Sequence, residues 1–408
     1  MRILIACDSF KGCFGSAEAA GYISTGILKV VPDAEIDVIC IADGGEGTAL
    51  ILSEMLGGDP RRTRVCGPLG DPVDAFFSAL PGGSAVMDMA SASGLTLMPE
   101  GKRDVMAAST FGAGQLILAA LEHECRRIYI GIGGSATNDG GLGMAAALGV
   151  RFYDKHGQKL GGAAQQNSPL RGTAQQNSLL SGKDMIDVAA IDVSDIDHRL
   201  ASTEISILCD VRNPLCGPNG AARTYGPQKG ATPEQVGLLD RGLAHLAEVV
   251  KRDIGPDLAD VEGIGAAGGL GLSLIAFAGA KILRGIDYVL DTAGFDEKAR
   301  RSDLIITGEG KMDAQSFYGK AVSGIAKRGM ELGVPVIAVC GSIDANGVDM
   351  QKLRSVGVCA AEAAVCRPME LGEAIEKGPD YLVQATERIM RAIAIGSRLG
   401  EGPRIMIC

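Results

Sequence analysis

The two ends of the chain repeat one pattern, in which short apolar runs alternate with longer amphipathic stretches. Runs that are hydrophobic at almost every position are typical of parallel strands covered by helices on both faces. The apolar runs occupy residues 2–7, 35–42, 302–310, 335–342 and 357–365, and helical patterns occupy residues 16–31, 47–58, 316–333 and 380–399. We therefore expect both chain ends to join in one doubly wound α/β domain.

The middle of the chain follows a different pattern. Residues 63–80 alternate between polar and apolar and contain Gly-Pro and Asp-Pro turns, which predicts a hairpin. Residues 84–90 have a strand pattern and residues 109–123 a helix pattern. At 408 residues the chain is long enough for two or three domains. We expect two, an α/β domain of residues 1–60 and 288–408 and a mixed α/β domain of residues 61–287 inserted into it.

Charge and cysteine usage exclude several classes of protein. The formal net charge is −10 and no run of Lys or Arg offers a basic surface, so nucleic acid is not an expected partner. A single small anion remains compatible with this charge, because a few lysines and backbone N–H groups suffice to bind it. The eleven cysteines include no C-x-x-C pair and there are four histidines, which argues against a zinc site and suits a reducing cytoplasm.

One stretch, Gly263 to Ala280, has eighteen residues without a charge. Its length is at the lower limit for a membrane span and six of its residues are glycine, so we expect a glycine-rich loop followed by a buried helix, and no membrane partner. The apolar run at the N-terminus is too short for a signal sequence. A polar tandem repeat, GAAQQNSPLR and GTAQQNSLLS over residues 162–181, is expected to be a surface loop.

Polar residues follow four of the predicted strands, in the motifs DSFK, DGGEGT, GEGKMD and GS. Ligands of open parallel sheets bind beyond the carboxyl ends of the strands. Carboxylates can bind a hard cation there, lysines can neutralise phosphate, and glycines let backbone N–H groups approach phosphate oxygens, so these motifs suit a Mg²⁺–nucleotide site. The residues expected at this edge are Asp8, Ser9, Lys11, Asp43, Glu46, Glu309, Lys311, Asp313 and Ser342.

Two motifs of the middle segment supply further candidates. In CDVRNPL, Asp210 follows an apolar run and can present a carboxylate to a hydroxyl substrate, although a polar turn closed by Asn-Pro has the same composition. In YGPQKGA, Lys229 lies between two glycines before a Thr-Pro-Glu helix start, which suits an anion-binding turn.

The turn GIGGSA, residues 131–136, matches the dinucleotide fingerprint G-x-G-x-x-[GA], and Asp154 follows about twenty residues later. An NAD-dependent oxidoreductase is therefore one alternative function. Against it, TNDGGLG prolongs the turn where a helix should begin, and the preceding strand does not open a βαβαβ unit. No Walker A motif is present, which excludes an ordinary P-loop kinase.

Together these motifs resemble those of the bacterial glycerate kinases of the GlxK/GarK type, also called class II or glycerate 2-kinases. The matching stretches run in order from residue 8 to about 330 and include DSFKG, ADGGEGT, GPLGDPV, MASASGL, GIGGSATNDGGLGM, NPLCGPNGA, YGPQKGAT, GAAGGLG, GIDYVLD, ITGEGKMDAQS and GKAVSGIAK. The resemblance implies phosphorylation of D-glycerate by ATP with Mg²⁺, mainly to 2-phosphoglycerate, in glyoxylate or sugar-acid catabolism. It also implies two α/β domains, one of them Rossmann-like, with the active site in the cleft between them.

The resemblance also implies which residues form the site. The expected catalytic residues are Asp210, Asp43, Lys11, Asp8 and Lys229. Asp210 is our first choice of catalytic base and Asp43 is the second. Glu309 and Asp313 are expected to bind Mg²⁺, and Lys11, Lys229 and Lys320 to contact phosphates or the substrate carboxylate. Substrate and nucleotide contacts are expected from Ser9, Gly44, Gly45, Glu46, Gly133, Gly134, Ser135, Asn138, Asp139, Asn213, Gln228, Gln315 and Lys320.

The chain departs from the usual family pattern in three places. Cys7 stands where a proline is usual, GEGKMDAQS replaces the commoner G-E-G-R-[IL]-D-x-Q, and the QQNS repeat is an addition. The first two leave the polar site residues in place. A catalytically inactive glycerate or sugar-acid sensor stays a second alternative. The sequence leaves open whether the product is 2- or 3-phosphoglycerate, and it leaves open the oligomeric state, a homodimer included.

Overall fold

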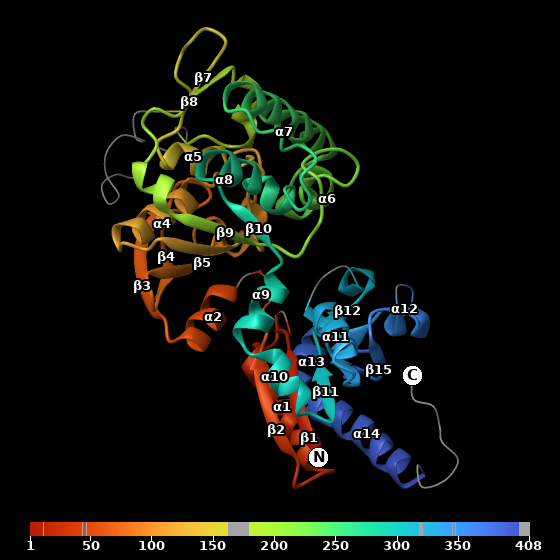
Figure 1. The fold of residues 1–408 in the computed structure, drawn as a ribbon. Helices are drawn as coiled ribbons and strands as arrows, with labels where there is room; N and C mark the ends of the chain where they lie inside the picture. The colour runs from red at the N-terminus through yellow and green to blue at the C-terminus, as the bar shows by residue number, and fades with distance from the viewer. Residues whose placement is uncertain are drawn as a thin grey trace. The chain divides into compact units, whose positions relative to one another are not determined.

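The structure, a computed structural model, divides into two compact units. Unit 1 contains the described residues up to Ala42 and those from Ile286 onward, and unit 2 contains those from Gly44 to Gly285 (Figure 1). The residues that the structure describes are 1–10, 12–42, 44–45, 47–161, 179–317, 321–344, 346 and 348–399.

The domain boundary expected at residue 60 is wrong, because the chain enters unit 2 before helix α2 (Thr48–Leu56) begins. That helix packs on strands β4 and β5 of unit 2. Its first turn is held there by Asp88 at the end of β5, whose carboxylate accepts hydrogen bonds from the backbone N–H groups of Gly47 and Ala49 at 2.8 and 3.1 Å. The other boundary, between Gly285 and Ile286, lies close to the one expected at residue 287.

Unit 1 is built on a five-stranded parallel sheet in the order β15-β13-β11-β1-β2. Its strands are β1 (Arg2–Cys7), β2 (Glu35–Cys40), β11 (Leu304–Thr307), β13 (Val336–Cys340) and β15 (Val358–Ala363), with a small pair β12 (Lys311–Met312) and β14 (Ser342–Ile343). If the five strands are numbered 1 to 5 in chain order and read from β2 to β15, the order is 2-1-3-4-5. This is the order of flavodoxin-like folds and differs from the 3-2-1-4-5-6 order of the dinucleotide-binding Rossmann fold. The strand order reverses between β1 and β11, which is where such folds bind ligands.

Helices cover both faces of this sheet, as the apolar runs predicted. Helices α1 and α14 pack together over the face that carries Ile3 and Ile5 of β1. Helix α11 covers the opposite face, where a Cβ on its Gly329 would meet Val336 and Ile305 side chains at 2.4 and 3.1 Å. The helices of unit 1 are α1 (Ser16–Leu28), α9 (Gly285–Thr292, which begins at the last residue of unit 2), α10 (Phe295–Arg300), α11 (Ala321–Glu331), α12 (Met350–Ser355), α13 (Leu371–Glu376) and α14 (Gly378–Leu399).

The contact between α1 and α14 depends on Gly26. A Cβ at this position would lie 2.6 Å from the Thr386 Cβ and 2.7 Å from the Val383 carbonyl oxygen, so Gly26→Ala should lower the free energy of unfolding by about 1–3 kcal/mol. Gly21 on the same helix is exposed with no atom within 4 Å of such a Cβ, and Gly21→Ala should raise it by about 0.5–1 kcal/mol. Urea unfolding of both variants checks the pair, and equal effects would contradict this packing.

Unit 2 contains a six-stranded mixed sheet in the order β10-β9-β6-β5-β4-β3. Neighbours from β10 to β5 are parallel, and β5, β4 and β3 are antiparallel, which includes the hairpin predicted over residues 63–80. Its strands are β3 (Asp59–Cys66), β4 (Pro72–Leu80), β5 (Ser84–Asp88), β6 (Arg127–Gly131), β9 (Glu204–Leu208) and β10 (Lys281–Leu283), with a separate pair β7 (Arg151–Tyr153) and β8 (Ala190–Asp192). Its other helices are α3 (Ala90–Ser93), α4 (Phe111–Glu122), α5 (Leu142–Ala147), α6 (Ala221–Tyr225), α7 (Pro233–Asp253) and α8 (Leu270–Ala278).

The uncharged stretch Gly263 to Ala280 forms glycine turns and then helix α8, whose residues from Leu270 to Leu274 are buried in the core of unit 2. This confirms the loop and buried helix expected there. None of the described helices is both long enough and apolar enough to cross a bilayer. The QQNS repeat lies outside the described residues except for its last three positions.

Candidate active-site residues

Unit 1 contains a cavity of about 500 Å³ at the carboxyl ends of β1, β11, β13 and β15. The position agrees with the point where the strand order reverses. It also agrees with the general location of ligand sites in open α/β sheets. The cavity is lined by Asp8, Ser9, Phe10, Cys13, Phe14, Glu309, Gly310, Lys311, Gly341, Ser342, Ala364, Val365, Met369, Leu371, Ala374, Ile375, Gly378, Tyr381 and Leu382.

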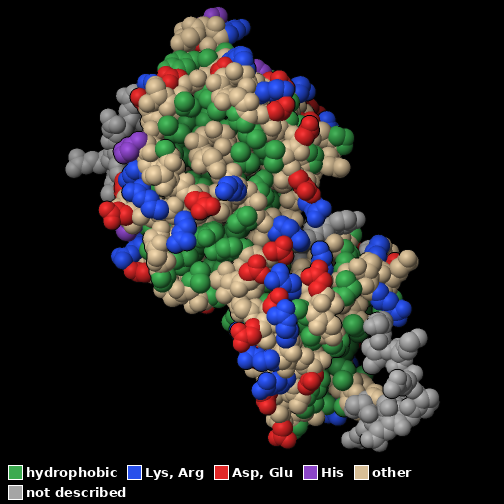
Figure 2. Space-filling view, viewed as in Figure 1, with side chains coloured by type: hydrophobic (Ala, Val, Ile, Leu, Met, Phe, Trp, Pro, Cys, Tyr) green, Lys and Arg blue, Asp and Glu red, His purple; other side chains and the backbone are tan. Residues whose placement is uncertain are grey.

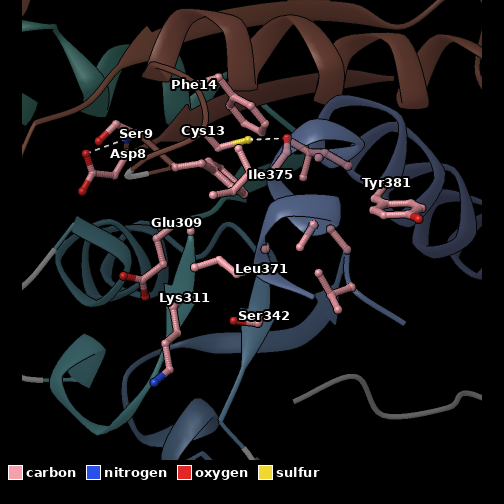
Figure 3. Close-up of a pocket in the computed structure, with 18 of the residues that line it drawn as sticks. Asp8, Ser9, Cys13, Phe14, Glu309, Lys311, Ser342, Leu371, Ile375 and Tyr381 are labelled. Carbon is pink, nitrogen blue, oxygen red and sulfur yellow. Dashed lines mark hydrogen bonds between the residues drawn. The ribbon is translucent and has the colours of Figure 1, made fainter. Parts of the chain in front are cut away.

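The cavity has a polar side and an apolar side (Figure 3). Asp8, Glu309 and Lys311 lie on one side of the view, where the strands end, and Ile375 and Tyr381 of α13 and α14 lie toward the other. The Asp8 carboxylate is buried and accepts a hydrogen bond from the Ser9 backbone N–H at 2.7 Å.

The structure brings together five of the residues expected at this sheet edge. Asp8, Ser9, Glu309, Lys311 and Ser342 all line the cavity. Asp313 follows β12 and is not among the lining residues. Predictions for the remaining residues stay predictions, because Lys11, Asp43, Glu46 and Lys320, and the side chain of Gln315, lie outside the described part of the chain.

In unit 2, Asp210 lies two residues beyond the carboxyl end of β9 and is buried. A Cβ on Gly285 would lie 3.1 Å from both the Asp210 carboxylate and the Gly44 backbone. Gly44 has φ +75°, and a Cβ there would lie 2.7 Å from the Leu208 carbonyl oxygen. Only glycine fits such close backbone contacts. The turn that contains Gly44 and Gly45 therefore lies directly against the carboxyl end of β9, beside Asp210.

The turn after β6 joins the same edge. Its Gly133 donates a backbone hydrogen bond to the Gly44 carbonyl at 3.1 Å, and a Cβ on Gly133 would lie 2.6 Å from the Gly45 Cα. The Gly134 carbonyl accepts a hydrogen bond from the Leu95 N–H at 2.8 Å. The glycines of GIGGSA are therefore explained by close packing of loops within unit 2.

Lys229 is almost completely buried, with 2% of its surface exposed. Its ammonium group donates hydrogen bonds to the Ser135 Oγ at 2.7 Å and to the Thr137 carbonyl at 2.6 Å. Lys229 therefore ties the short helical turn Pro227–Lys229 to the turn that follows β6. Burial lowers the pKa of Lys229 to about 7, an effect that the charge of Asp139 opposes.

This lowered pKa predicts a pH dependence of stability. Between about pH 7 and 10.5 the unfolded chain retains the Lys229 proton that the folded chain has lost, so folding becomes more favourable as pH rises through this window. The unfolding free energy of wild type relative to Lys229→Met should therefore increase by about 2 kcal/mol from pH 7 to 9. Urea unfolding at both pH values checks it, and a difference that does not vary with pH would mean that Lys229 stays charged.

Asp139 is fully buried and holds two helix starts together. Its carboxylate accepts four hydrogen bonds, from the backbone N–H and hydroxyl of Thr110 before α4 and from the backbone N–H groups of Gly141 and Gly143 at the start of α5. Burial raises the pKa of the Asp139 carboxyl against the opposing effect of these bonds. We infer that Asp139 is a positioning residue, because its oxygens are occupied within unit 2.

Asn138 is also fully buried, and its side-chain amide has no hydrogen-bond partner among the described residues. The hydroxyl of neighbouring Thr137 has none in the described part of the chain either. A buried polar group left unpaired costs about 1–3 kcal/mol. Such groups often mark where water or a ligand binds, which keeps Asn138 a candidate for a substrate contact.

The remaining candidates of unit 2 differ in exposure. The Asn213 amide donates to the Asn219 carbonyl at 2.8 Å, and its oxygen accepts from the Tyr225 hydroxyl at 2.7 Å. Asn213 therefore stabilises its own loop. The Gln228 side chain is exposed, and the backbone carbonyl of Gln228 accepts a hydrogen bond from the Arg103 guanidinium at 3.3 Å.

The geometry of unit 2 does not match an NAD site. No helix follows β6 directly, since α5 begins only at Leu142. Asp154 lies in an exposed turn after β7, where its carboxylate accepts the backbone N–H groups of His156 and Gln158. Strand β7 pairs with β8 in a separate antiparallel ladder. An acidic residue that binds ribose should instead end a strand next to the fingerprint strand.

Sequence reasoning missed the apolar wall of the unit 1 cavity. Residues 364–382 supply much of this wall, but the stretch Arg367–Glu370 between β15 and α13 carries no motif of known chemistry. Leu371, in the first turn of the short helix α13, is 74% exposed. Only the structure shows that this apolar side chain is exposed at the edge of the cavity.

Charges on the face shown in Figure 2 are mixed, with Lys and Arg interspersed among Asp and Glu. Within the described residues, no three His, Cys, Asp or Glu side chains are grouped as a metal site.

Comparisons with known proteins agree over almost the full length. The model of the glycerate kinase family matches residues 3–394. The chain is 42% identical to the glycerate kinase of Bacillus subtilis, over 98% of this chain and 99% of that protein. It is 40% identical to the glycerate 2-kinase of Escherichia coli, over 98% and 99%. A crystal structure of a "putative glycerate kinase 2" from Salmonella typhimurium LT2 superposes with a TM-score of 0.78 at 36% identity, covering 98% of this chain and all of that one.

Proposed function

This chain belongs to the glycerate kinase family, and we propose that it phosphorylates D-glycerate to 2-phosphoglycerate with ATP as the donor. The relatives named above are glycerate kinases, which does not favour an oxidoreductase or an inactive sensor. The structural observation that carries the proposal is the position of Asp210. It is a buried carboxylate just beyond a strand end, and a Cβ on Gly285 would lie 3.1 Å from both this carboxylate and the Gly44 backbone.

We propose an in-line transfer of the terminal phosphoryl group to a glycerate hydroxyl. Phosphoryl transfer needs little covalent help from the protein, so positioning and neutralisation of charge supply most of the rate. In this proposal an Asp210 carboxylate oxygen accepts the hydroxyl proton, and the orphaned amide of Asn138 orients the substrate. Lys11 and Lys320 are the proposed cations for the phosphates or the substrate carboxylate, and Lys229 is proposed to hold the turn after β6 in place.

The residues of unit 1 suit a magnesium ion that is bound together with a nucleotide. Mg²⁺ is commonly held by one or two carboxylates, with phosphate oxygens and water completing its shell. Glu309 and Asp8 line the unit 1 cavity and offer such oxygens, and we propose Glu309 and Asp313 as the protein ligands. When bound, the ion neutralises charge on the phosphate oxygens.

Phosphorus NMR of the product tests both the reaction and its position. The protein is incubated with ATP, Mg²⁺ and D-glycerate, with L-glycerate as the matched control. We expect the resonance of 2-phosphoglycerate to grow with D-glycerate in step with ADP. The resonance of 3-phosphoglycerate would overturn the position of transfer, and ADP without a phosphorylated acid would overturn the proposed function.

We also propose a cytoplasmic location for the enzyme, where its donor is abundant. The described cysteines are free thiols, as is usual in a reducing compartment.

A further inference from the structure

The apolar side of the unit 1 cavity is not used by the reaction proposed above. Part of it is formed by Phe10 and Phe14, which are hydrogen-bonded to each other through their backbones: the Phe10 N–H donates to the Phe14 carbonyl at 2.9 Å, and the Phe14 N–H donates to the Phe10 carbonyl at 3.2 Å. The rings of these two residues stack with centroids 4.9 Å apart. An ordered aromatic pair next to a cavity offers a rigid apolar surface.

Helices α13 and α14 complete this side. The Cys13 thiol donates a hydrogen bond to the Ile375 carbonyl at 3.2 Å, and a Cβ on Gly378 would lie 2.8 Å from the Cys13 sulfur. The start of α14 is therefore packed directly onto the aromatic turn. Leu371 and Ile375 at the edge of the cavity keep 74% and 38% of their surfaces exposed, and apolar side chains left exposed around a cavity mark a binding site for an apolar group.

Size and polarity decide between the two substrates. At about 500 Å³ the cavity has the volume of sites that bind molecules as large as a nucleoside. Glycerate is a three-carbon acid, so it would leave most of this volume empty and would meet apolar walls with its hydroxyl and carboxylate groups. A nucleoside has a flat, largely apolar base that can stack on aromatic and aliphatic side chains, and ribose hydroxyls that can donate to carboxylates.

We propose that the apolar side of this cavity, formed by Phe10, Phe14, Leu371, Ala374, Ile375 and Tyr381, binds the adenine base of the phosphoryl donor. The ribose then faces Asp8 and Ser9 on the polar side. The assignment rests on the proposed kinase function for the identity of the nucleotide. The residues after β15 thereby act in donor binding, a role that no motif in them indicates.

The test fills the apolar side and measures the two substrates separately. In Ala374→Phe the new ring occupies the place of the base, so the KM for ATP should rise at least tenfold while the KM for D-glycerate, at saturating ATP, stays within twofold. Glu376→Phe is the matched control, because it adds the same ring to the same helix at an exposed position outside the lining. Equal KM values for ATP in folded Ala374→Phe and in wild type would overturn the proposal.

A second measurement does not depend on turnover or on a folded variant. Adenosine should slow the alkylation of Cys13 by N-ethylmaleimide in wild type, followed residue by residue by mass spectrometry. The exposed Cys366 lies just outside the lining and should react at an unchanged rate. Protection of Cys13 by adenosine without glycerate phosphorylation would support the base site and reject the kinase function. Phosphorylation by ATP with Cys13 unprotected at saturating adenosine would reject the base site alone.

Discussion

Asp210→Asn should reduce kcat for D-glycerate by about 10²–10⁴-fold, the range expected when a general base is removed. The substitution keeps the shape of the side chain, which matters because Asp210 is buried against Gly285 and the Gly44 turn. An amide cannot accept the hydroxyl proton, yet it can still fill the same space. The unfolding midpoint should therefore change little, and KM for glycerate should move less than kcat. Steady-state kinetics with thermal unfolding measure both quantities.

Asp253→Asn is the control for a simple loss of negative charge in unit 2. Its carboxylate accepts the Ile191 backbone N–H and pairs with Arg252 at the end of α7, so it has a structural role of its own. We expect its kcat to stay within about threefold of wild type, because its hydrogen-bond and ion-pair partners, Ile191 and Arg252, are not candidate site residues. If Asp210→Asn retained near-normal turnover, Asp43 would become the preferred base.

The sheet architecture was predictable because buried parallel strands leave a strong pattern in the sequence. The run at residues 2–7 forms β1, and the runs beginning at 302 and 335 contain β11 and β13. The convergence of Asp8, Glu309 and Ser342 followed from the same reasoning, since the carboxyl ends of parallel strands meet at one edge. The boundary expected at residue 60 differs from the observed one, because the periodicity of a helix does not show which sheet the helix packs against.

The roles of the buried polar residues of unit 2 were not predictable. Whether a lysine in a glycine-rich turn points outward to an anion or inward depends on which distant loops pack around it. Lys229 turned inward because the Ser135 hydroxyl and the Thr137 carbonyl offer acceptors. Asp139 and Asn138 were both predicted to contact the substrate or the nucleotide. The Asp139 carboxylate accepts hydrogen bonds from backbone N–H groups, whereas the Asn138 amide has no hydrogen-bond partner among the described residues. A single sequence does not distinguish a carboxylate that binds substrate from one that binds its own backbone.

The hydrogen bonds of Asp139 predict a loss of stability rather than a loss of chemistry. In Asp139→Asn one acceptor oxygen becomes an N–H₂ donor that faces other donors, from Thr110, Gly141 or Gly143. Removing the charge of a buried carboxylate that its partners depend on typically costs about 3–5 kcal/mol of unfolding free energy. Urea unfolding should show this loss. Hydrogen exchange should place it at the amides of α4 and α5, with those of the unit 1 sheet protected as in wild type.

Thr110 provides the graded test of the same network. Its hydroxyl donates to Asp139 at 2.8 Å and accepts the Met144 backbone N–H at 2.9 Å, so Thr110→Val should cost about 1–3 kcal/mol by leaving a buried partner unpaired. Thr110→Ser keeps the hydroxyl and should cost less than either. The order Asp139→Asn, Thr110→Val, Thr110→Ser follows only if Asp139 acts through the fold. If Asp139→Asn kept wild-type stability but lost turnover, the carboxylate would instead belong to the substrate site.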